Sequence, residues 1–189
     1  MVGTDGATPP IRIVLIGMMG SGKSSVGHAL AARTGWPFVD NDALVEGVTG
    51  LSAREHLESM GETELRRVEA DALSAALAHP PPVIVSAAGG TILDAGHRSA
   101  LADAGFVVWL RGPAGVLAAR AAGAGHRPWL DGDAQAWFDT ALAAREPLYA
   151  GVADLVLDIE ALDPFDAAAR IVEEVGHRQG STKPRHDSR

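Results

Sequence analysis

The chain has 189 residues, of which 47% are apolar, and a formal net charge of −8. This length and apolar content predict one globular domain, and the acidic balance argues against nucleic acid or an anionic membrane as the main partner. The lack of cysteine excludes disulfides and thiolate chemistry, and the lack of a long apolar stretch or a secretory signal predicts a cytoplasmic protein.

Short apolar runs alternate along the chain with segments of helical spacing. Strands are predicted at residues 11–16, 37–39, 83–85, 106–110 and 155–157. Helices are predicted at residues 24–34, 44–48, 52–61, 63–79, 97–104, 113–122, 134–145 and 165–175. Residues 123–133, rich in glycine, proline and charge, are predicted to form a mobile lid. The ordered domain is expected to span residues 11–177, between a flexible leader at residues 1–10 and a disordered tail at residues 178–189.

Strands that alternate with helices predict an α/β fold with three layers, in which helices cover both faces of a parallel sheet of five strands. Right-handed crossovers place the loops that follow the strands along one edge of such a sheet. Three segments rich in polar or small residues follow predicted strands, at residues 17–24, 40–42 and 88–91. We therefore expect these segments to meet in one crevice.

Residues 17–24 match the phosphate-binding pattern G-x-x-x-x-G-K-S/T, between a predicted strand and a predicted helix. The glycines let backbone N–H groups approach phosphate oxygens, Lys23 can bridge the β- and γ-phosphates, and the Ser24 hydroxyl can bind Mg²⁺. The residues expected to hold the nucleotide phosphates are Gly20, Ser21, Gly22, Lys23, Ser24 and Ser25. This motif indicates a nucleoside triphosphate and Mg²⁺, but it does not distinguish a kinase from a GTPase or an ATPase.

An acidic segment, Asp40-Asn41-Asp42, directly follows the second predicted strand. Carboxylates at this place could bind a metal ion or a substrate hydroxyl. Aspartate is also common in acidic loops and at helix N-caps, so the segment alone leaves both interpretations open.

From about residue 11 to residue 175 the chain resembles the shikimate kinases, a branch of the P-loop kinases with the nucleoside-monophosphate-kinase-like fold. Besides the phosphate-binding loop and the acidic segment, the motifs that carry the resemblance are Gly61-Glu62-Thr63-Glu64-Leu65-Arg66, Gly89-Gly90, His126-Arg127-Pro128-Trp129-Leu130 and Arg145-Glu146-Pro147-Leu148-Tyr149. The resemblance implies transfer of the γ-phosphoryl group of ATP to the 3-hydroxyl of shikimate.

On the acceptor side, the resemblance implies that Arg66 and Arg145 bind the substrate carboxylate, a role that suits the planar guanidinium fork. It also implies that Asp42 binds the substrate hydroxyls and receives the proton of the attacking oxygen. Gly89 and Gly90 would bring backbone N–H groups up to the substrate. From the helical spacing alone, Arg66 could instead be a surface residue paired with Glu62 or Glu69.

On the nucleotide side, the resemblance implies that Asp40 holds Mg²⁺ through water together with Ser24. Arg127, in the predicted lid, would close over the phosphates and act with Lys23 in catalysis. Arg120 and Pro164 would lie near the adenine, while from the sequence alone Arg120 could equally be a solvated surface residue. A monomer is expected.

The chain departs from the family pattern at four positions. It has Ala88 where the family has a first glycine, Leu57 and Leu65 where the family often has phenylalanine, and Glu160 in the adenine loop. These departures leave open a related kinase acting on another hydroxy acid such as gluconate, and a third alternative is a nucleotide-dependent regulatory module without catalysis. Trp36, Trp109 and Trp137 are assigned to packing rather than to stacking on a ligand.

Overall fold

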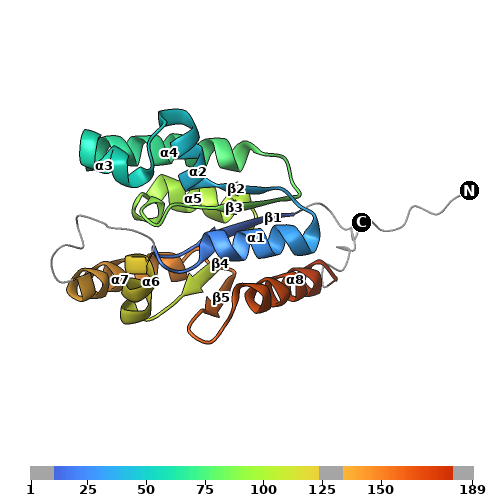
Figure 1. Ribbon diagram of the computed structural model, residues 1–189. Coiled ribbons are helices and arrows are strands. Elements are labelled where there is room, and N and C mark those ends of the chain that lie inside the picture. Colours follow the sequence, from blue (N-terminus) through green and yellow to red (C-terminus); the bar gives the residue numbers. More distant parts are fainter. Residues whose placement is uncertain (1–10, 124–133, 181–189) are drawn as a thin grey trace, which may run out of the picture.

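The computed structural model describes residues 11–123 and 134–180. Their strands form one parallel sheet in the order β2-β3-β1-β4-β5 (Figure 1). The strands are β1 (Arg12–Ile16), β2 (Phe38–Asp40), β3 (Val83–Ser86), β4 (Phe106–Arg111) and β5 (Leu155–Asp158). The chain winds to β2 and β3 on one side of β1 and to β4 and β5 on the other. Ligand crevices in such sheets form where the winding reverses, here at the end of β1.

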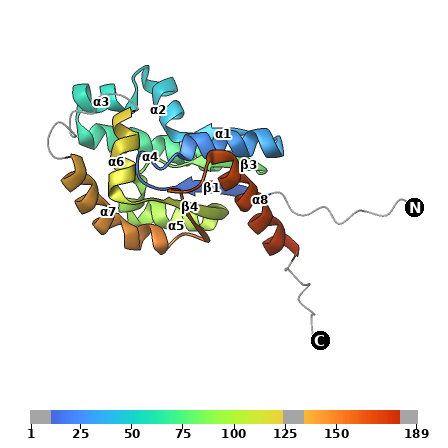
Figure 2. The ribbon, with the colours of Figure 1, turned by 60° about the horizontal axis from the view of Figure 1, so that its bottom comes forward.

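Helices cover both faces of this sheet. They are α1 (Lys23–Thr34), α2 (Asn41–Thr49), α3 (Ala53–Met60), α4 (Glu62–Ala78), α5 (Ala95–Ala104), α6 (Ala114–Gly123), α7 (Ala134–Ala150) and α8 (Pro164–Gly180), with a short 3₁₀ helix, η1 (Thr91–Leu93). Figure 2 places α1 and α5 on opposite sides of the central strands, and α8 packs against α1. The predicted three-layer α/β/α class is confirmed. Within the described residues, no helix has the length and apolar character that a membrane span requires.

The central strands are buried on both faces, which explains why their sequences are continuous apolar runs rather than alternating patterns. In β1, Ile13 to Leu15 are fully buried, and Val14 lies beside Val85 of β3 and Val107 of β4. The close packing of these central strands fixes the direction in which the chain leaves β1. It therefore also fixes the position of the loop at residues 17–22.

Three predicted boundaries are corrected by the structure. Helix α2 begins at Asn41 rather than at residue 44, because the Asp40 side chain caps it by accepting from the backbone N–H of Asp42. Helix α7 continues past residue 145 and through Pro147 to Ala150. Helix α8 continues past residue 178, where the tail was expected to begin.

The extension of α8 has a local cause. Arg178 donates to the Asp154 carboxylate at 2.6 Å, and its guanidinium lies 4.8 Å from the centre of the Phe106 ring. These contacts tie the last turns of α8 to the edge of the sheet. The predicted leader at residues 1–10, most of the predicted lid, at residues 124–133, and the rest of the predicted tail, at residues 181–189, lie outside the described residues.

Candidate active site

The loops that follow β1, β2 and β3 open into one cavity of about 640 Å³. Most of the predicted site residues line it: Gly20, Ser21, Gly22, Lys23, Ser24, Ser25, Asp42, Arg66, Gly89, Gly90, Arg120, Arg145 and Pro164. Asp40 does not line the cavity but is hydrogen-bonded to Ser24, which does. Arg127 lies outside the described residues. The structure therefore brings together segments that are far apart in the sequence.

The loop between β1 and α1 has the geometry of an anion site. Gly22 has a φ of 84° and immediately precedes Lys23, the first residue of α1, so the chain turns sharply into the positive N-terminal end of the helix. The Lys23 ammonium folds back over the loop and donates to the carbonyl oxygens of Gly17 at 3.0 Å and Met18 at 3.1 Å. These contacts hold the ammonium at the mouth of the loop, where phosphate oxygens would bind.

The acidic segment both caps a helix and contacts the phosphate-binding loop. Asp40 caps α2 with Oδ1, which accepts from the Asp42 N–H at 3.2 Å. Its other oxygen, Oδ2, accepts a hydrogen bond from the Ser24 hydroxyl at 2.6 Å. The N-cap interpretation is thus confirmed for Asp40 without removing it from the phosphate-binding loop. Asp42 lies in the first turn of α2, is exposed, and lines the cavity.

Arg66 lies on the cavity wall formed by α4. Its guanidinium pairs with Glu62 at 3.1 Å and with Glu69 at 2.7 Å, which are the helical pairings that the spacing allowed. Because Arg66 also lines the cavity, these pairings hold it there rather than on an outer surface. Burial is the largest single influence and opposes the charge, but the Glu69 and Glu62 carboxylates together outweigh it and raise the pKa of Arg66 above its ordinary value.

Glu69 is a cavity residue that the sequence analysis considered only as a partner of Arg66. It is 6% exposed, on the side of α4 that faces the cavity. Burial raises the pKa of Glu69 above its ordinary value, and the neighbouring Asp42 carboxylate acts in the same direction, against the attraction of Arg66. The sequence shows that Glu69 lies one helical turn from Arg66, which was the available signal for a site residue. It does not show that Glu69 is buried, because burial depends on how α4 packs.

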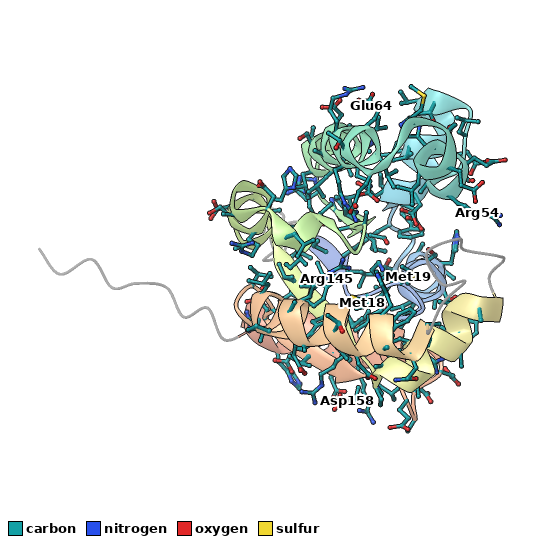
Figure 3. The ribbon with its side chains drawn as sticks, turned by 90° about the vertical axis from the view of Figure 1, so that its left-hand side faces the viewer. Met18, Met19, Arg54, Glu64, Arg145 and Asp158 are labelled. Atoms are coloured by element: carbon teal, nitrogen blue, oxygen red, sulfur yellow. The ribbon has the colours of Figure 1, made fainter. Side chains whose placement is uncertain are left out.

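Arg145 enters the cavity from α7, opposite α4. Figure 3 shows Arg145 with Met18 and Met19 between α7, below, and the α3–α4 pair, above. One guanidinium nitrogen lies 3.4 Å from the Met18 sulfur, and Cζ lies 5.7 Å from the centre of the Trp137 ring. Trp137, which was assigned to packing, packs against the main core and also lines the cavity.

A second aromatic residue of α7 supports the loop after β3. The Tyr149 hydroxyl donates to the Gly89 carbonyl at 2.8 Å, and its ring stacks on Trp109 at 5.6 Å. Burial raises the pKa of Tyr149 well above its ordinary value, so the hydroxyl keeps its proton and remains a donor. Tyr149 thus fixes a backbone segment that the sequence analysis expected to contact the acceptor.

The predicted adenine side is formed by α6 and the start of α8. Arg120 is exposed and donates to the Ile159 carbonyl at 3.1 Å. Pro164 is the first residue of α8, whose N–H groups at Phe165 and Asp166 donate to the Asp163 side chain. The cavity wall here therefore combines an arginine with apolar and small residues.

Three of the four departures from the family pattern, at Leu57, Leu65 and Ala88, line this cavity. Ala88 is 7% exposed and, like every non-glycine residue described, does not have a positive φ, so its methyl group causes no backbone strain. Leu57 of α3 and Leu65 of α4 line the cavity as an apolar wall. Glu160 is exposed and does not line the cavity.

A phosphate-binding loop on a parallel sheet, with a lysine, a carboxylate and two arginines in one cavity, defines a P-loop kinase. The family model described as shikimate kinase matches residues 19–176, and the chain belongs to the shikimate kinase family. The shikimate kinase of Symbiobacterium thermophilum is 39% identical over 171 residues, which cover 89% of this chain and 98% of that protein.

Solved structures support the same placement. Shikimate kinase from Acinetobacter baumannii, in complex with shikimate, is similar with a TM-score of 0.85 and 28% identity, over 93% of this chain and 97% of that one. A gluconokinase from Sinorhizobium meliloti is similar with a TM-score of 0.55 and 25% identity, over 89% of this chain and 97% of that one. The architecture thus agrees more closely with the shikimate kinase than with the gluconokinase.

We expect Gly90→Ala to raise the KM for the acceptor about tenfold while changing the KM for ATP little. A Cβ at Gly90 would overlap Nη1 of Arg66, so the guanidinium would have to leave its present place on the cavity wall, and a tenfold change corresponds to about 1.4 kcal/mol. Steady-state kinetics with each substrate varied in turn would measure both constants. Gly47→Ala, in α2 with no atom near the added methyl group, is the matched control. Equal KM values for the Gly90 variant and wild type would contradict the expectation.

Proposed function

We propose that this chain transfers the γ-phosphoryl group of ATP to the 3-hydroxyl of shikimate, a step of chorismate and aromatic amino-acid biosynthesis. One observation carries the proposal: Lys23, Asp42, Arg66 and Arg145 line the same cavity. A phosphate-binding loop and two guanidinium groups are therefore available to one complex that contains both substrates. The similarity to relatives named shikimate kinase supports shikimate as the acceptor.

The acceptor carboxylate would bind between Arg66 and Arg145, which approach the cavity from α4 and α7. Guanidinium groups bind carboxylates through paired, charge-assisted hydrogen bonds, so two of them fix both position and orientation. Backbone groups of Gly89 and Gly90 would contact the ring, with Tyr149 holding Gly89 in place. Glu69 would balance part of the Arg66 charge and hold that guanidinium against the cavity wall.

In the transfer step, the acceptor hydroxyl oxygen would form a bond to the γ-phosphorus as the bond to the β-phosphate oxygen of ADP breaks. Asp42 would orient that hydroxyl and take its proton. Lys23 would neutralise charge on the transferred group, with the positive end of α1 directed at the same phosphates. Positioning and electrostatics therefore account for the chemistry, and no covalent intermediate with the protein is needed.

We propose Ser24 and Asp40 as the residues that would hold Mg²⁺. A hydroxyl and a carboxylate 2.6 Å apart, next to the phosphate loop, are oxygen donors that suit this cation. Within residues 11–123 and 134–180 there is no cluster of three or more His, Cys, Asp or Glu side chains that could hold a metal ion. When bound, Mg²⁺ would neutralise phosphate charge.

We further propose that the enzyme acts as a cytoplasmic monomer on a small molecule, without a nucleic-acid or membrane partner. Lys23, Asp42, Arg66 and Arg145 of a single chain already line one cavity. The net charge of −8 disfavours polyanionic partners.

The test is ADP release from ATP and Mg²⁺ with shikimate, with gluconate, and with no acceptor. We expect shikimate to raise the rate at least about a hundredfold over both other conditions, because a site built to bind polar groups rejects acceptors that leave them unpaired. Phosphorus NMR would identify the 3-phosphate. A higher rate with gluconate would overturn the acceptor, and a rate independent of any acceptor would overturn the kinase assignment.

A further inference from the structure

The side chains in direct contact with the Arg145 guanidinium carry no charge, although the buried Glu69 carboxylate, with which it forms no ion pair, also attracts it. Its guanidinium contacts the Met18 sulfur at 3.4 Å and lies 5.7 Å from the centre of the Trp137 ring. Within the part of the chain that the structure describes, no ion pair is recorded for Arg145. The charge of Arg145 is therefore positioned without a direct ion pair, and Glu69, whose pKa is lowered more by Arg66 than by Arg145, compensates Arg145 less than it compensates Arg66.

Arg66, on the opposite wall, is held in a different way. Glu62 and Glu69 both pair with it, so part of its charge is already compensated before any ligand binds. A carboxylate ligand at Arg66 competes with these partners, whereas at Arg145 it would find a cation whose direct contacts are an aromatic ring, a thioether and the Tyr149 hydroxyl. Of the two arginines, Arg145 thus offers the less compensated charge.

We propose that Trp137 is a positioning residue that holds the Arg145 guanidinium toward the acceptor carboxylate. The inference rests on the proposed function, because it takes Arg145 as a carboxylate ligand. The ring face attracts a cation electrostatically and restricts its rotamers, yet it cannot remove the charge as a carboxylate partner would. Trp137 lowers the entropic cost of binding by fixing Arg145 in advance.

The packing of α7 makes Trp137 a firm support. Its ring meets the ring of Phe138 edge-to-face, with centroids 5.1 Å apart and planes at 83°. Phe138 is fully buried in the main core, and Trp137 is partly buried against that core. A rigid path therefore leads from the core through Phe138 and Trp137 to Arg145, whose long side chain would otherwise be mobile.

The experiment compares Trp137→Leu and Trp137→Phe in the full chain, with the KM for shikimate, the KM for ATP and kcat measured for each. Leucine keeps apolar bulk but removes the π face, so we expect the KM for shikimate to rise about fivefold, with kcat and the KM for ATP changed less than about twofold. Phenylalanine keeps a π face and should restore most of the affinity. Trp36→Phe, which changes a tryptophan that does not line the cavity, is the control.

A double-mutant cycle with Arg145→Gln separates this inference from the proposed function. If Trp137 acts through Arg145, Trp137→Leu will have little further effect on the KM for shikimate once Arg145 is glutamine. If Trp137→Leu raises that KM by the same factor in both backgrounds, or does not raise it at all, the inference is overturned while the role of Arg145 stands. If Arg145→Gln itself leaves the KM for shikimate unchanged, the assignment of Arg145 in the proposed function is overturned, and the inference with it.

Discussion

Lys23→Met is expected to lower kcat by about a hundredfold to a thousandfold, the range found when one preorganised electrostatic contact to a transition state is removed. The methionine side chain is of similar length but carries no charge. The ammonium of Lys23 is already placed at the mouth of the loop by the carbonyl oxygens of Gly17 and Met18. Coupled ADP release at saturating shikimate would measure the loss, with thermal unfolding recorded in parallel.

The matched control for this variant is Arg98→Met. Arg98 also donates to two successive backbone carbonyl groups, those of Ile92 at 2.8 Å and Leu93 at 2.9 Å, but it does not line the cavity. Arg98→Met should therefore change kcat by less than about twofold, as surface substitutions usually do. Similar losses of kcat in both variants would mean that the lysine acts by supporting its loop rather than by contacting the transferred phosphate.

The parts of the site that are local in sequence were predictable from spacing. The phosphate loop needs its glycines, lysine and serine within residues 17–24, because one short turn must present all of them to the same phosphates. The strand before it and the helix after it were equally predictable. The strand is buried along its length and reads as a continuous apolar run, and the helix is buried on one face and shows helical spacing. The convergence of the loops after β1, β2 and β3 followed from the handedness of parallel crossovers.

What depends on packing between distant elements could not be predicted from the sequence. The burial of Glu69 requires α4 to lie against the cavity, and the contact of Trp137 with Arg145 depends on side-chain directions within α7. Helix α2 starts early because Oδ1 of Asp40 caps it. The other oxygen of the same carboxylate accepts a hydrogen bond from Ser24. The helix through Pro147 is likewise decided by tertiary contacts of α7 rather than by propensity.

Asp42→Asn tests the group proposed to take the proton. Asparagine keeps the size and can still contact a hydroxyl, but it cannot accept the proton, so we expect kcat to fall about a hundredfold to ten-thousandfold. The KM for ATP should stay within about twofold, because the phosphate loop is unchanged. Steady-state kinetics with both substrates varied would give the two constants.

A negative charge in the first turn of a helix also stabilises that helix, so the effect of losing this charge must be separated from the effect on chemistry. Asp166→Asn supplies the comparison, because Asp166 occupies the first turn of α8 as Asp42 occupies that of α2, and both are exposed. Both variants should lose a similar small amount of stability, about 0.3–1 kcal/mol, and only the Asp42 variant should lose kcat. If Asp42→Asn instead raised the KM for shikimate and left kcat intact, Asp42 would bind the acceptor hydroxyls without acting as the base. The transfer step would then need another proton acceptor. Solvent water could take that role, because Asp42 is exposed and water can reach this part of the site.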